Sequence, residues 1–222
     1  MDNGHMDNGD MDGGIHGQWQ HGRCHHHDDR HDEQSMTDAL PDLDVDGIFE
    51  VLATGVDFPL SPRLPVTQLD HALQTAALLA HLHPGDDELA AAGLVHDIGH
   101  LLPGGTDEAH ATDAARAVRR ALGERVAGTV GLHVAAKRYL VATDAGYGGV
   151  LTNDSVLSLG RQGGAMTEEE AADFLAQPWA EDAVTLRRAD DSGKVEGVVV
   201  GDLAGWAPLL QQLSRRTGAI GG

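Results

Sequence analysis

The apolar run at residues 90–95 leads directly into His96 and Asp97. A helix that buries these small and aliphatic side chains also buries the turn after them, and a buried His–Asp pair is costly unless its polar atoms find partners. Imidazole and carboxylate together suit iron, manganese, zinc or copper better than calcium. We therefore expect a metalloenzyme, in which the pair is joined by other residues of the same kinds, namely His71, His110, His133 and Asp190.

The pattern of apolar residues from Thr37 onward is helical nearly throughout. Thr67 and Asp70 form a capping signal in front of a helix over 68–82, and Gly99 and Gly123 are expected to end helices. Only 195–200 suggests a strand. We predict an all-α helical bundle whose other helices lie at 86–98, 107–122, 124–141, a short segment capped by Asn153, 167 onward, 178–190 and 202–216.

Residues 1–36 differ from the rest of the chain because they are rich in His, Asp and Gly and almost free of apolar side chains. Such a segment cannot bury enough surface to offset the entropy of ordering it. We expect a disordered tail at 1–36 and one folded domain at 37–222. A metal-scavenging role for the tail is the alternative, since it holds half of the 14 histidines: His5, His16, His21, His25, His26, His27 and His31.

Charge and composition narrow the classes of partner. The net charge of -20 argues against a nucleic-acid backbone as the main partner, because no basic face is available to release counterions. Cys24 is the single cysteine and no apolar run could cross a bilayer, so we expect a cytoplasmic protein outside the membrane. A small anionic substrate fits if a few cations converge locally. The oligomeric state stays open.

Several segments resemble one family closely. They are QLDHALQ at 68–74, LVHDIGH at 94–100, HVAAKRYL at 133–140, QGG at 162–164 followed by Met166, and Arg187 three residues before Asp190. These strings are similar to those of the HD-domain mixed-valent diiron oxygenases, members of the HD superfamily that cleave the carbon–phosphorus bond of hydroxylated alkylphosphonates. The similarity spans about 66–194. The HVAAKRYL string is specific, whereas the His–Asp pair alone is not.

The resemblance implies an HD-domain bundle with two iron ions, Fe(II) and Fe(III), that uses O2 to convert a 1-hydroxyalkylphosphonate into a carboxylate and phosphate. It makes Asp97 the bridge between the irons and completes the ligand set with His71, His96, His110, His133 and Asp190. It also assigns the phosphonate oxygens to His100, Lys137, Ser155 and Arg187. Physical chemistry favours that assignment, because a phosphonate dianion needs cations and hydrogen-bond donors.

The chain departs from the family ahead of His71. Members that act on an aminated substrate carry a Tyr and a Glu there, and the corresponding residues are Ser61 and Leu64. The carboxylate that would meet an ammonium group is then missing. We therefore expect a substrate without the amino group, such as hydroxymethylphosphonate, or one whose cation is recognised elsewhere.

Two other functions compete with this reading. A metal-dependent HD phosphohydrolase, acting on a nucleotide or another phosphate ester through a metal-activated water, would need the same His, His–Asp and Asp set. Against it stand His110 and His133 as additional ligands. The third reading is a binding or regulatory protein that keeps a degenerate HD fold while the His-rich tail binds metal. The presence of a residue at each expected ligand position argues against it.

Overall fold

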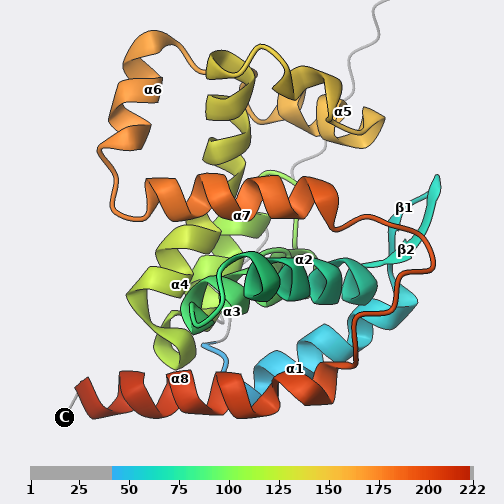
Figure 1. The fold of residues 1–222 in the computed structure, drawn as a ribbon, viewed down its shortest axis with the longest axis vertical. Coiled ribbons are helices and arrows are strands. Elements are labelled where there is room, and N and C mark those ends of the chain that lie inside the picture. The colour runs from blue at the N-terminus through green and yellow to red at the C-terminus, as the bar shows by residue number, and fades with distance from the viewer. Residues whose placement is uncertain (1–41, 221–222) are drawn as a thin grey trace, which may run out of the picture. The chain divides into compact units, whose positions relative to one another are not determined.

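The computed structural model describes residues 42–220. The predictions for the tail at 1–36 fall outside this range. Within it, the helices confirm the all-α fold class (Figure 1). The helix expected over 86–98 ends earlier, at Val95, so Gly99 lies in a 3-10 turn, and the helix expected from Pro178 begins at Ala180. The α-helices are α1 (Val45–Thr54), α2 (Gln68–Leu82), α3 (Asp87–Val95), α4 (His110–Thr143), α5 (Asn153–Arg161), α6 (Glu168–Leu175), α7 (Ala180–Ser192) and α8 (Ala207–Ile220). Short 3-10 turns occupy η1 (Gly55–Asp57), η2 (Ile98–Leu101), η3 (Tyr147–Gly149) and η4 (Leu203–Trp206).

Local side-chain bonds set where the helices begin. Thr67 and Asp70 form the expected capping box at the start of α2, and Thr167 and Glu170 form another before α6. Each box satisfies two backbone N–H groups that the first helical turn leaves free. One expectation was wrong: the cap of α5 is Thr152, not Asn153, because the Thr152 hydroxyl accepts the N–H of Ser155.

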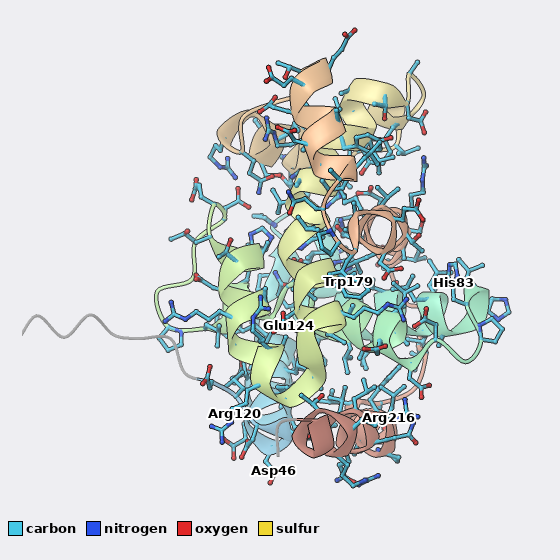
Figure 2. The ribbon with its side chains drawn as sticks, turned by 90° about the vertical axis from the view of Figure 1, so that its left-hand side faces the viewer. Asp46, His83, Arg120, Glu124, Trp179 and Arg216 are labelled. Atoms are coloured by element: carbon cyan, nitrogen blue, oxygen red, sulfur yellow. The ribbon has the colours of Figure 1, made fainter. Side chains whose placement is uncertain are left out.

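Helix α4 reverses direction at Gly123. This residue has φ 89° and ψ 176°, values that are not helical and that glycine adopts without a steric penalty. A straight helix would separate His110 and His133 by roughly 35 Å, at 1.5 Å per residue, whereas their Nε2 atoms lie 3.1 Å apart. The predicted helices at 107–122 and 124–141 are therefore the two arms of a hairpin. An ion pair between Arg119 and Glu124 spans the bend, and Figure 2 labels Glu124 there.

The expected strand at 195–200 was wrong. Its backbone is irregular and is held by one side chain, because the Gln74 amide bonds the N–H and C=O of Val195 and the C=O of Val198. The strands of the described residues lie elsewhere, in a short antiparallel hairpin of β1 (Pro59–Ser61) and β2 (Leu64–Thr67). The three prolines at 59, 62 and 65 obscured this hairpin in the sequence, since proline weakens a strand pattern.

The main hydrophobic core lies between α2, α3, the two arms of α4, α7 and α8. The apolar segment before the His–Asp pair is buried without interruption, as expected, and Leu94 and Val95 have no exposed surface. This core fixes the helix ends that carry the candidate ligands. Within residues 42–220, no helix combines the length and the apolar character that crossing a membrane requires.

Candidate metal centre

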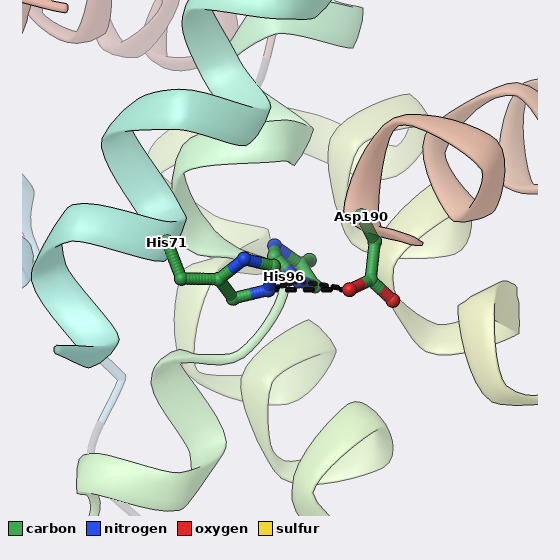
Figure 3. A group of neighbouring side chains, drawn as sticks. All are labelled: His71, His96 and Asp190. Atoms are coloured by element: carbon green, nitrogen blue, oxygen red, sulfur yellow. Dashed lines mark hydrogen bonds and ion pairs between the residues drawn. The ribbon is translucent and has the colours of Figure 1, made fainter. Parts of the chain in front are cut away.

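Three helices bring the first group of candidate ligands together. His71 lies in the first turn of α2, His96 follows the last residue of α3, and Asp190 lies in the last turn of α7. The Nε2 atoms of the two histidines are 3.1 Å apart, and Oδ1 of Asp190 lies 3.2 Å from Nε2 of His71 and 3.9 Å from Nε2 of His96 (Figure 3). All three side chains are buried. We refer to this group as the inner position.

The two arms of α4 supply the second group. His110 begins the first arm and His133 lies on the second, and both are buried with their Nε2 atoms 3.1 Å apart. The main chain permits this approach because η2 packs closely on the start of α4. A Cβ on Gly99 would lie 2.0 Å from the carbonyl oxygen of His110, so no larger residue fits there. We refer to His110 and His133 as the outer position.

Asp97 lies between the two positions. Its Oδ2 is 3.7 Å from Nε2 of His71 and 3.5 Å from Nε2 of His96, while its Oδ1 is 3.6 Å from Nε2 of both His110 and His133. One carboxylate thus turns one oxygen to each pair of imidazoles. The six residues expected from the sequence converge in one place, in an arrangement with room for two ions joined by a carboxylate.

Hydrogen bonds set the tautomer of all four rings. Each Nδ1 lies 2.7–2.9 Å from a main-chain carbonyl oxygen, which can only accept, so each Nδ1 donates a proton and the neutral ring leaves Nε2 bare. The acceptors are the carbonyls of Gly193, Gly93, Asp107 and Val130, for His71, His96, His110 and His133 respectively.

Two bare nitrogens 3.1 Å apart repel each other unless a cation or a proton lies between them. A proton is disfavoured at three of the rings: burial lowers the pKa of His96 and His110, and burial together with the neighbouring His110 lowers the pKa of His133 well below its usual value. Two nitrogens that each lie about 2.1 Å from one ion at a right angle are about 3 Å apart. The donor set therefore fits a metal ion at each position.

Both carboxylates are poised as anions. Burial opposes their ionisation. It is outweighed at Asp190 by Arg187 and Lys194, and at Asp97 by the positive charge that histidines 96, 100 and 110 carry when protonated, so the pKa of each carboxyl lies well below its usual range. Metal binding requires deprotonated ligands, so at neutral pH these two carboxylates would not have to lose a proton when a metal binds. The His/Asp cluster points to a metal cofactor.

A cavity of about 310 Å³ opens on the outer position. Asp97, His110, His133 and Asp190 line it, while His71 and His96 lie behind them. All four residues that the resemblance assigns to the phosphonate also line it. His100 stacks on the His110 ring at 4.1 Å between centroids, Nζ of Lys137 donates to Oγ of Ser158, and Ser155 lies in the first turn of α5.

Arg187 is engaged by the protein more than the resemblance suggests. Its Nε donates to the Tyr147 hydroxyl over 2.9 Å, and its two terminal nitrogens donate to Asp190 and Asp191. Tyr147 in turn donates to Asp191. Arg187 thus holds the Asp190 carboxylate from behind and keeps only part of its donor capacity for a ligand in the cavity.

Sequence analysis missed some of the lining residues. Lys194 places Nζ 2.7 Å from Oδ1 of Asp190, and Ser158 accepts from Lys137. Lys194 is one of only two lysines and lies four residues after Asp190, just beyond the end of α7 at Ser192. Burial and the charge of Arg187 lower the pKa of Lys137 to about 8. Three cations therefore meet in this strongly acidic chain: Lys137, Arg187 and Lys194.

Comparison with known proteins agrees with this geometry. The model of the HD domain matches residues 69–170. The chain is 42% identical over 147 residues to a hydroxymethylphosphonate dioxygenase of Gimesia maris, covering 62% of this chain and 73% of that one. It is 32% identical over 157 residues to a glycine-betaine-forming [1-hydroxy-2-(trimethylamino)ethyl]phosphonate dioxygenase of Leisingera caerulea, covering 67% and 80%. A converging His/Asp centre and these relatives together show that the chain belongs to the HD-domain phosphonate dioxygenases.

Proposed function

We propose that this protein cleaves the carbon–phosphorus bond of a 1-hydroxyalkylphosphonate oxidatively, with O2, at a centre of two iron ions. With hydroxymethylphosphonate, one O2 is consumed and formate and phosphate are released. The two oxygen atoms added to the products come from O2, and the carbon is oxidised as the bond to phosphorus breaks. The relatives named as phosphonate dioxygenases support this reaction.

The observation that carries the proposal is the position of Asp97 between two imidazole pairs. Its two oxygens face different histidines at 3.5–3.7 Å, which is the arrangement that two adjacent ions need and a single ion does not. We assign His71, His96 and Asp190 to one ion, His110 and His133 to the other, and Asp97 to both.

Iron is the metal we propose. The donor set of imidazole and carboxylate suits iron or manganese, and a reaction with O2 requires an ion that changes valence. A mixed-valent Fe(II)/Fe(III) pair would supply one electron to activate O2 and would recover it during the turnover, so that the four electrons that reduce O2 come from the substrate carbon. The protein's own contribution is to keep four Nε2 atoms unprotonated, to hold Asp97 ionised and to leave the outer position open to the cavity.

The cavity is suited to a small dianion. Lys137 and Lys194 bring ammonium groups to its lining, Arg187 adds a guanidinium, and Ser155 and His100 add further hydrogen-bonding groups. These residues would orient the phosphonate oxygens so that the hydroxylated carbon faces the outer position. We further propose a substrate without an amino group, because Ser61 and Leu64 both line the cavity and neither carries a negative charge.

Purified protein reconstituted with iron tests the proposal. We expect hydroxymethylphosphonate to cause O2 uptake and phosphate release in a one-to-one ratio, and electron paramagnetic resonance to show a coupled mixed-valent pair. Metal should be counted in the full chain and after removal of residues 1–35, because seven tail histidines could bind additional ions. Two irons retained by the shortened protein would exclude the reading in which only the tail binds metal.

The alternative function is hydrolysis of a phosphate ester by a metal-activated water. Phosphate release that continues without O2, or that requires only zinc or magnesium, would replace the oxygenase with this hydrolase.

A further inference from the structure

We propose that Ser61 and Asp154 form a clasp that closes one wall of the cavity and makes these two residues determinants of substrate size. The inference rests on the proposed function, since it names which 1-hydroxyalkylphosphonates the cavity admits. It assigns a role to Asp154 that the ligand set and the phosphonate-binding residues do not include.

Two segments far apart in the sequence form this wall. The β1–β2 hairpin contributes Leu60, Ser61, Pro62 and Leu64, and α5 with its cap contributes Thr152, Asp154, Ser155 and Ser158. The Ser61 hydroxyl donates to Oδ2 of Asp154, and Nη1 of Arg63 lies 3.3 Å from Oδ1 of the same carboxylate. Within residues 42–220, every hydrogen bond between the hairpin and α5 runs through Asp154.

Burial distinguishes the two bonds of the clasp. Ser61 is only 6% exposed, whereas the Arg63 side chain is 66% exposed and its ion pair is screened by water. The Asp154 side chain is 42% exposed, so both bonds are partly hydrated at the carboxylate. The Ser61 bond is the stronger connection, because it is charge-assisted and its donor is buried, whereas the Arg63 donor is in water. We expect loss of Ser61 to open the wall and loss of Arg63 to have little effect.

The clasp also explains how a carboxylate can line a cavity for an anion. Both oxygens of Asp154 already have partners, one from a hydroxyl and one from a guanidinium. Its charge is thus directed to the wall and not to the substrate. This arrangement argues against Asp154 as a receptor for a substrate ammonium group, and Leu64 on the same wall adds an apolar surface.

The test compares Ser61→Ala and Asp154→Ala with the intact full-length protein, all iron-loaded. Arg119→Ala is the control, since it removes an exposed ion pair on α4 away from this cavity. For each protein, kcat/KM is measured with hydroxymethylphosphonate and with the bulkier 1-hydroxybutylphosphonate. We expect both clasp variants to lower the ratio of the small to the bulky substrate by roughly tenfold, about the value of one charge-assisted hydrogen bond, while the control leaves it unchanged.

Amide hydrogen exchange gives a readout that does not depend on activity. Exchange at 59–67 and 153–161 should become faster together in both clasp variants and stay unchanged in α2. Unchanged exchange would show that no clasp exists, and faster exchange with an unchanged substrate ratio would show that the clasp does not select substrates; either result overturns the inference. A wild-type preference for 2-amino-1-hydroxyethylphosphonate that Asp154→Asn abolishes would also overturn it, by making Asp154 an ammonium receptor.

These outcomes are separable from failure of the proposed function. If the wild-type protein releases no phosphate from any of these phosphonates, the proposed function fails and the claim about substrate size fails with it. The exchange measurement would still decide whether Ser61 and Asp154 hold the hairpin to α5.

Discussion

The inner and outer positions of the candidate centre use the same chemistry but differ in access. The inner histidines, His71 and His96, have no exposed surface and do not line the cavity, whereas His110 and His133 both do. The inner position has two imidazoles, a carboxylate of its own and a shared one, while the outer position has two imidazoles and the shared carboxylate. The outer position therefore has fewer protein donors on the side where a substrate can enter.

The two positions are also built differently. Three separate helices and the hydrophobic core hold the inner one, and Arg187 and Lys194 support its Asp190. The outer one comes from a single helical hairpin that reverses at Gly123. The difference teaches that a closed, core-supported position and an open, hairpin-supported one can share one carboxylate. In the proposed centre, one ion would be held in the core while the other would stay accessible from the cavity.

Asp97→Ala should impair both positions at once, because it removes the one carboxylate that they share. We expect kcat to fall by on the order of 10³-fold or more, equivalent to roughly 4 kcal/mol in the barrier, with less than one metal retained per chain. Elemental analysis and O2-uptake kinetics check this. A variant that keeps two metals and most of its activity would show that Asp97 does not join the positions.

Two histidine variants, one in each position, test whether the inner and outer positions differ in metal content and stability. His133→Ala should lose the outer metal and retain the inner one, whereas His71→Ala should lose the inner metal. His71→Ala should also lower the free energy of unfolding by about 1–3 kcal/mol more than His133→Ala, because it leaves the Gly193 carbonyl without a donor, while the Val130 carbonyl lies inside α4. Metal content and denaturant unfolding measure both effects. Equal metal loss and equal stability in the two variants would contradict the difference between the positions.

Tyr147→Phe tests the support of the inner position without touching a candidate ligand. The change removes the acceptor of the Arg187 Nε and the donor to Asp191 while keeping the ring. We expect metal affinity or kcat to fall by about 10- to 100-fold, as is typical when a residue behind a ligand is lost. Competitive chelator titration and kinetics check it, and Tyr139→Phe, in α4 where the ring packs against Phe174, is the matched control. An unchanged metal affinity and kcat would refute the supporting role.

Lys137, which lines the cavity, should have a smaller effect on kcat/KM, and that effect should depend on pH. Burial and Arg187 lower the pKa of Lys137 to about 8, so its ammonium is charged below that pH and neutral above it. We expect kcat/KM for the phosphonate dianion to decline above about pH 8, by up to tenfold per pH unit, because the cation is lost in the free enzyme. Lys137→Arg should keep its charge and extend the plateau. The same decline in that variant would assign the pH dependence to another group.

Much of the fold could be predicted because its signals are local. The capping boxes at Thr67 and Thr167 mark helix starts, and Gly123 marks the reversal within α4. The β1–β2 hairpin was missed because its prolines hide the strand pattern, and the strand expected at 195–200 was wrong because the Gln74 side chain, distant in sequence, takes its backbone bonds.

The residues of the candidate site also fall into those that the sequence could identify and those that it could not. The six His and Asp residues were identifiable from their types and from the resemblance, and they converge as expected. Lys194, the Tyr147–Asp191 support of Arg187 and the Ser61–Asp154 contact were not, because each depends on which elements meet in space.

By itself, the sequence of this protein determined an all-α domain and a set of metal-binding side chains, because caps, helical periodicity and residue chemistry act over a few neighbouring residues. Only the tertiary structure decided that the imidazoles form two pairs, that Asp97 lies between them, and that one pair faces a cavity. Those features depend on contacts across 20 to more than 100 residues of chain, where packing of the core sets distances that no local pattern encodes.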